Sequence, residues 1–130
     1  MSLRSPLGKV LGRGAAKQGV AHWWVQRTTA IALVPLTIWF VFQLVHLPTA
    51  DFGAVRDWAA DGLNPVLLIL LIGAMSWHSA LGVQVVIEDY VPHKGAKVAA
   101  LLVNNLFHVV IAVAATYAVL RIAFTTFTAG

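Results

Sequence analysis

Residues 64–87 read NPVLLILLIGAMSWHSALGVQVVI and decide the fold. The run contains no Asp, Glu, Lys or Arg, and it is longer than the roughly 20 residues that a helix needs to cross a bilayer. Two more apolar runs, at about 23–47 and 97–124, reach the same length. Only a helix satisfies its backbone hydrogen bonds within one span. The sequence therefore predicts an all-α membrane protein with three transmembrane helices.

The composition supports a membrane protein. Of the 130 residues, 59% are hydrophobic and 11% are charged, whereas soluble domains carry about 25% charged residues. The chain has no cysteine, so it cannot hold a thiolate-ligated iron–sulfur cluster or attach haem through C-x-x-C-H. Any such centre must lie on a partner. We expect no cleaved signal peptide, because the first apolar run is too long and two others follow it.

The positive charges predict the orientation. Residues 1–22 form a glycine-rich basic arm, and 23–130 the membrane anchor. The arm and the 88–97 region are rich in Lys and Arg, whereas the 48–63 loop has one Arg and three Asp. The positive-inside rule puts the N-terminus and the 88–96 loop in the cytoplasm and the C-terminus outside. Basic residues beside an apolar run favour a membrane surface over nucleic acid as the partner of the arm.

His78 is the first candidate for chemistry. It lies inside the second span, about ten residues and so about 15 Å from the inner end. Ionisable residues at such depth mark functional sites, and neutral imidazole is a common ligand of haem iron. The alternative is a histidine hydrogen-bonded to a neighbouring helix.

Asp89 and Tyr90 follow His78 at the inner end of the same span. Eleven residues turn a helix through about 1100°, so Asp89 lies about 20° from His78 around the axis and about 16 Å further along. Gly82, one turn from His78, leaves room for a flat macrocycle or for close helix packing. An Asp-Tyr pair alone is usually a solvated helix boundary, and its spacing from His78 is what makes it a candidate.

Two other polar residues lie inside the spans. Arg27, near the start of the first span, either snorkels to the interface or pairs with a buried anion such as a haem propionate. His108, in the third span, lies at nearly the same depth as His78 and could pair with a polar group of a packed helix or bind haem. Depth does not separate the two histidines. Pro35 predicts a kink in the first helix.

The string H-x10-D-Y formed by His78, Asp89 and Tyr90 resembles the signature of the hydrophobic membrane-anchor family of succinate dehydrogenase, respiratory complex II. The stretch 22–40, HWWVQRTTAIALVPLTIWF, and the order of arm, three spans and short second loop also look like that family. The resemblance covers essentially the whole chain.

The resemblance implies half of a two-subunit anchor bundle in a bacterial inner (cytoplasmic) membrane or its equivalent. It implies a flavoprotein subunit, an iron–sulfur subunit and a second anchor, the cytochrome b subunit, as partners. It also implies that His78 is one axial ligand of haem b, that Asp89 and Tyr90 line the ubiquinone site, and that Arg27 lies near the haem propionates or the quinone. The chain would then be a non-catalytic part of an enzyme of the tricarboxylic acid cycle and respiratory electron transport. His108 is outside the family pattern.

Other functions remain open on the sequence. The related one is the anchor of a quinol:fumarate reductase, because sequence does not give the direction of electron flow. The unrelated ones are a redox-inert assembly subunit and a small transport subunit. A transporter is expected to show repeats or broken helices at the midplane, whereas here only Pro35 interrupts a span.

Overall fold

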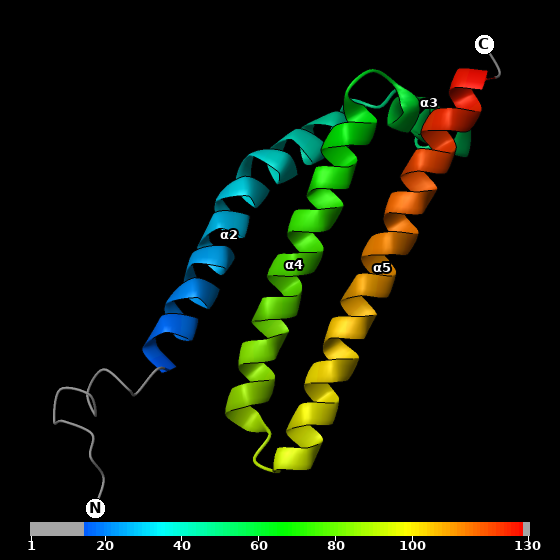
Figure 1. Cartoon of the computed structure of the whole chain (residues 1–130). Helices are drawn as coiled ribbons and strands as arrows, with labels where there is room; N and C mark the ends of the chain where they lie inside the picture. The colour runs from blue at the N-terminus through cyan, green and yellow to red at the C-terminus, as the bar shows by residue number, and fades with distance from the viewer. Residues whose placement is uncertain (1–14, 129–130) are drawn as a thin grey trace, which may run out of the picture.

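The computed structural model describes the backbone of residues 15–128 and the side chains of residues 20–125. It contains α2 (Ala15–Val45), α3 (Phe52–Ala60), α4 (Asn64–Tyr90) and α5 (Lys94–Thr128), with no strand within the described backbone (Figure 1). Three helices are long and apolar enough to cross a membrane, over Val20–Val45, Asn64–Tyr90 and Lys94–Thr125. The predicted all-α architecture with three membrane-spanning helices is confirmed.

Each helix extends beyond its predicted span at one or both ends, although α2 ends at Val45, two residues before the predicted end. Helix α2 begins at Ala15, inside the predicted arm, because the segment AAKQ at 15–18 consists of good helix formers. The rest of that arm, residues 1–14, lies outside the described part. Helix α4 continues to Tyr90 and α5 begins at Lys94, so Asp89 and Tyr90 are helical residues.

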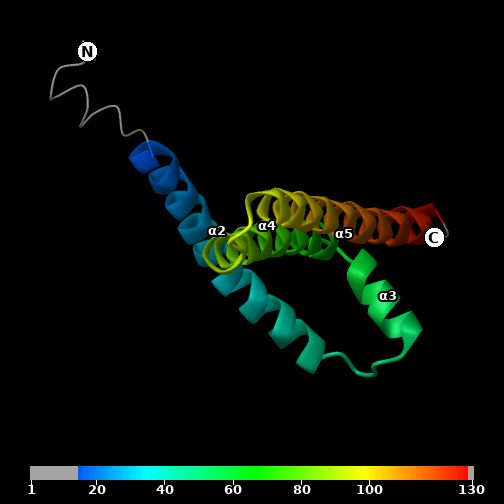
Figure 2. The same cartoon turned by 90° about the horizontal axis from the view of Figure 1, so that it is seen from below.

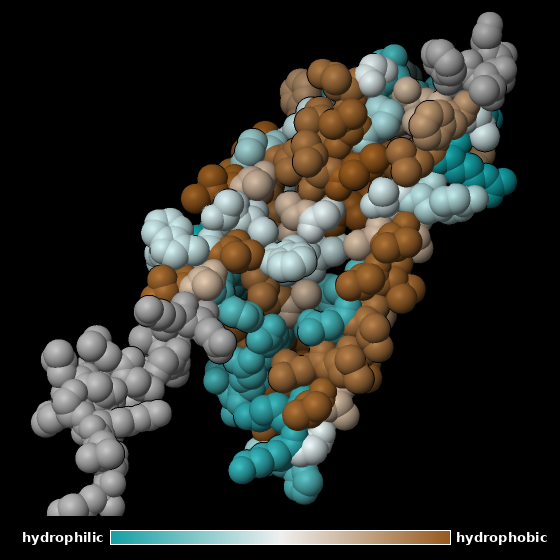
Figure 3. Space-filling model, in the orientation of Figure 1, coloured by the Kyte–Doolittle hydropathy of each residue, from teal (hydrophilic) through white to brown (hydrophobic). Residues whose placement is uncertain are grey.

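Helix α4 is the centre of the bundle. It packs against α2 on one side and α5 on the other, whereas the backbones of α2 and α5 do not approach each other closely within the described residues (Figures 1 and 2). Few described side chains are buried, and apolar residues cover most of the face in Figure 3. Hydrophilic residues gather toward the end where α4 turns into α5. The bundle is therefore open, and lipid or other protein must cover most of its surface.

Helix α2 changes direction along its length (Figure 1), and it contains the predicted kink residue Pro35. Proline lacks the N–H that would bond the carbonyl of Ile31, and its ring crowds that carbonyl.

The segment 48–63 was expected to be a loop, but it contains helix α3. Asp51 caps this helix, since its carboxylate accepts a hydrogen bond from the Ala54 N–H at 2.8 Å. This bond, and a second from the Thr49 hydroxyl, hold the pKa of the Asp51 carboxyl below its usual value. The loop prediction was wrong because this cap and the inward packing of Trp58 and Ala59 outweigh the polar composition.

Helix α3 covers one end of the bundle. It packs on α5 and α4, and Ala59 is buried with Leu68 and Val119. Trp58 stacks on Trp39 of α2 at 6.1 Å between ring centroids. Helix α3 thereby ties together all three spans at this end.

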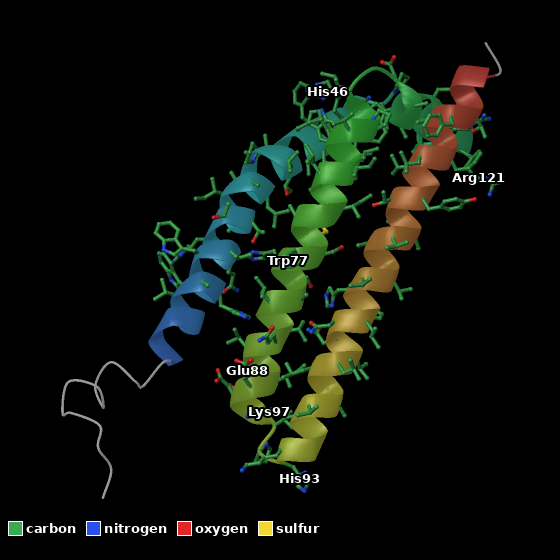
Figure 4. The ribbon with its side chains drawn as sticks, in the orientation of Figure 1. His46, Trp77, Glu88, His93, Lys97 and Arg121 are labelled. Atoms are coloured by element: carbon green, nitrogen blue, oxygen red, sulfur yellow. The ribbon has the colours of Figure 1, made fainter. Side chains whose placement is uncertain are left out.

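The α4–α5 turn forms the other end. Only residues 91–93 separate the two helices. The ammonium of Lys97 donates a hydrogen bond to the Glu88 carbonyl at 2.7 Å, and the Lys97 N–H donates to the His93 carbonyl at 2.9 Å. Figure 4 shows these three residues together at this end. The positive charge of a lysine near the last carbonyls of α4 also interacts favourably with the negative end of the helix dipole.

Candidate functional site

His78 lies at the middle of α4 and is half-buried on the side of α2. Its Nδ1 is 3.0 Å from Thr29 Oγ1. The Thr29 hydroxyl also lies 3.0 Å from each of the carbonyls of Val25 and Gln26, and with its proton on either carbonyl its oxygen accepts from the Nδ1–H of His78. The Nε2 of His78 has no partner among the described side chains.

His108 is bound quite differently. Its Nδ1 donates to the Asn104 carbonyl at 2.8 Å, which leaves Nε2 to accept from the Ser79 hydroxyl at 3.1 Å. Next to it, Asn104 is buried and donates to the Ala80 carbonyl at 3.0 Å. Both ring nitrogens of His108 are thus used within the chain, and the residue joins α5 to α4. This is the packed-helix role that the sequence left open.

Arg27 and His78 line the same hollow. The hollow measures about 280 Å³ and is formed by α2 and α4 alone. Trp23, Gln26 and Ala30 complete its lining. The Arg27 guanidinium lies over the Trp23 ring, 5.3 Å from the centroid, and makes no ion pair with any described carboxylate. The arginine is therefore held in place while its charge stays available to an anion.

Asp89 and Tyr90 end α4 and are exposed, with 80% of Tyr90 accessible. Neither side chain has a hydrogen-bond partner within the described part, whereas the side chain of the adjacent Glu88 accepts a hydrogen bond from that of Gln84 at 2.8 Å. They are about three turns from His78 along the helix, so the structure does not bring them into the His78 hollow. The predicted residues form two places on one helix, a mid-membrane hollow and a helix end.

The comparisons with known proteins bear on the whole chain. A family model described as succinate dehydrogenase/fumarate reductase transmembrane subunit matches residues 1–122. The chain belongs to this family. Two curated proteins called succinate dehydrogenase hydrophobic membrane anchor subunit are similar to it. The one from Rickettsia bellii is 30% identical over 116 residues, covering 89% of this chain and 93% of that protein. The one from Rickettsia conorii is 29% identical over 112 residues, covering 85% and 89%.

A relative from another organism has a similar name. A succinate dehydrogenase membrane anchor subunit of Reclinomonas americana is 31% identical over 78 residues, 58% of this chain and 65% of that protein. No solved structure gives a significant match. The predicted family is thus confirmed.

Gly82 lies one turn from His78, and the space above it shows whether another group fits beside the histidine. A Cβ built on Gly82 would meet no heavy atom within 4 Å. The glycine is therefore not needed for close packing within the described helices, and the space beside it is open to a group from outside. The open space can take either a flat macrocycle or a helix of another chain.

The subunit has one candidate imidazole for a metal rather than a cluster. No group of three or more His, Cys, Asp or Glu that could hold a metal ion occurs among the described residues. Neither the contact of Thr29 with His78 nor that of Ser79 with His108 was predicted from the sequence.

Proposed function

We propose that this chain is the membrane-anchor subunit of succinate:ubiquinone oxidoreductase in the bacterial inner membrane or its equivalent. In this role it holds haem b together with a second anchor subunit and forms part of the ubiquinone-reduction site. The observation that carries the proposal is the unpartnered Nε2 of His78, whose ring is held at Nδ1 by the Thr29 hydroxyl of the neighbouring span. Family membership and the names of the relatives support the same function.

His78 is suited to be one axial ligand. A ligating histidine commonly donates its second ring N–H to an acceptor that fixes the ring, and Thr29 takes that place. Arg27, in the same hollow, would bind a propionate through a charge-assisted hydrogen bond. When bound, haem b supplies one-electron transfer. The second axial ligand would come from the other anchor.

Asp89 and Tyr90 would act on ubiquinone. Their position at the end of a membrane span gives access to lipid, from which an apolar quinone arrives, and to water, from which two protons come. The Tyr90 hydroxyl would donate to a quinone carbonyl and stabilise the negative charge that develops on its oxygen during reduction. Asp89 would relay protons to the same place. Arg27 is a second candidate to orient the quinone.

The chain is proposed to be non-catalytic by itself. Succinate oxidation would take place on a flavoprotein subunit, and an iron–sulfur subunit would carry the electrons, since this chain has no cysteine to ligate a cluster. The family model names fumarate reductase as well, so the anchor of a quinol:fumarate reductase is the second candidate.

A difference spectrum tests the proposal. The four subunits are co-expressed, purified through a tag on this chain, and compared with this chain expressed alone. We expect succinate to produce a reduced b-type band in the complex and no such band in the single chain. A complex that forms but never contains haem would contradict the haem assignment, and co-purification of none of the other subunits would contradict the function as a whole.

Reporter fusions test the proposed orientation. We expect fusions within 91–95 to be cytoplasmic and those at 53–60 and 128 to be external, because the Lys-rich turn should stay inside. A fusion after residue 15 should also be cytoplasmic. A reporter that is cytoplasmic at 128 would contradict the three-span orientation.

A further inference from the structure

The backbone carbonyl of Glu88 lacks its usual donor at the end of α4. In a helix this carbonyl would accept from the N–H four residues later, and that residue is Pro92, which has no N–H. The carbonyl of Ile87, one residue earlier, still accepts from the Val91 N–H at 3.0 Å. Pro92 therefore leaves the peptide group that joins Glu88 to Asp89 without a backbone donor.

The side chain of Lys97 supplies the missing donor. From the first turn of α5, its ammonium donates to the Glu88 carbonyl at 2.7 Å (Figure 4). Lys97 is half-buried and makes no ion pair with a described carboxylate. The carboxylate of Glu88 accepts from Gln84 instead. The lysine thus bonds the peptide group that leads into Asp89 and Tyr90.

The helix dipoles indicate that the end of α4, rather than α5, gains from this lysine. A positive charge is favourable at the C-terminus of a helix and unfavourable at the N-terminus. Lys97 stands near the N-terminus of its own helix, α5, and near the C-terminus of α4. Lys94 lies in the same turn of α5, but it is exposed and makes no side-chain hydrogen bond among the described residues. Of these two lysines, Lys97 is the one that donates to α4.

We propose that Lys97 is a positioning residue for the Asp89–Tyr90 pair, which it holds at the end of α4 through the Glu88 carbonyl. This inference rests on the proposed function, in which the pair acts on ubiquinone. Without the ammonium, the last turn of α4 has one donor fewer and frays more often. The Tyr90 hydroxyl then spends less time where it can donate to a quinone carbonyl, so the loss of Lys97 acts through the pair.

Hydrogen exchange tests the positioning step without an assay of turnover. In the purified four-subunit complex, we expect the backbone amides of residues 89–91 to exchange several-fold faster in Lys97→Met than in Lys94→Met. The two variants remove the same charge from the same turn, and methionine keeps an unbranched stem and a good helix propensity. Equal exchange rates in the two variants would overturn the proposal.

Turnover tests the consequence for quinone reduction. Lys97→Met should lower succinate–quinone reductase turnover several-fold, and Lys94→Met should leave it unchanged. Lys97→Arg should keep most of the turnover, because a guanidinium can also donate to the Glu88 carbonyl. Succinate oxidation with an artificial acceptor should stay near normal in all three variants. An equal loss of quinone reduction in Lys97→Met and Lys94→Met would trace the effect to the charge of the turn and overturn the proposal.

A double variant separates positioning from an independent structural role. If Lys97 acts through the pair, the loss in Lys97→Met combined with Tyr90→Phe should be well below the product of the two single losses, because coupled residues are not additive. Single losses that simply multiply would overturn the positioning role and leave the proposed function intact. Normal turnover in Tyr90→Phe alone would instead refute the proposed action of Tyr90 on quinone, and the positioning role with it.

Discussion

The His78→Leu variant should lose most of the haem b of the assembled complex, whereas His108→Leu should keep it. Leucine keeps the apolar volume at position 78 but removes the free Nε2 that we propose as the axial ligand. The expected result is a reduced b-type band at least several-fold weaker than in the wild type, measured per complex after reduction with dithionite. A dithionite spectrum reports bound haem even if electron transfer from succinate is impaired.

His108→Leu is the matched control, because both histidines lie at nearly the same depth and differ in their contacts. His108 already uses both nitrogens on Asn104 and Ser79. Its loss should cost stability, about 0.6 to 2 kcal/mol for an interhelical hydrogen bond in a membrane, rather than haem. Thermal melting of the purified complex would register that cost. Haem loss in the His108 variant with retention in the His78 variant would reverse the ligand assignment.

The Tyr90→Phe variant should lower succinate–quinone reductase turnover at least several-fold. The ring remains, so a role as an interfacial anchor would be preserved. Only the hydroxyl is lost, and a neutral hydrogen bond contributes about 0.5–1.5 kcal/mol net, or more where charge develops in a transition state. Because 80% of Tyr90 is exposed and its hydroxyl has no described partner, its loss leaves no unpaired group within this chain.

Two controls separate quinone binding from assembly. Succinate oxidation with an artificial acceptor at the soluble subunits should stay near normal, as should haem content. The other tyrosine of the chain is Tyr117, which is 65% exposed on α5, and Tyr117→Phe should leave turnover unchanged. Equal loss in both assays would point to failed assembly, and unchanged quinone reduction in Tyr90→Phe would reduce the residue to an interface anchor.

The sequence predicts the spans well because hydropathy over long windows identifies membrane spans. It predicts α3 poorly, because this nine-residue helix depends on one capping carboxylate and on tertiary packing of Trp58. Helix ends such as Ala15 also lie outside the apolar runs, where backbone propensity rather than hydropathy decides.

The candidate site, too, could be predicted only in part from the sequence. The relation of His78 to Asp89 follows from helix periodicity within one span, so it can be predicted from sequence. The different roles of His78 and His108 cannot be predicted from the sequence. The two residues lie at nearly the same depth, and they differ in which neighbouring helix each ring contacts. Thr29 is 49 positions from His78, and Ser79 is 29 from His108, so neither contact has a local signal.

The short turn between α4 and α5 has a consequence for how the chain enters the membrane. Loops of three residues close at little entropic cost, so these two helices can insert as one hairpin soon after synthesis. Helix α2 leaves the ribosome first, yet its packing partner α4 is made later. Until then α2 lacks this packing partner, and Thr28 and Thr29 do not need it because their hydroxyls bond carbonyls of their own helix. The nascent chain can thus expose its first span to lipid without unpaired threonine hydroxyls.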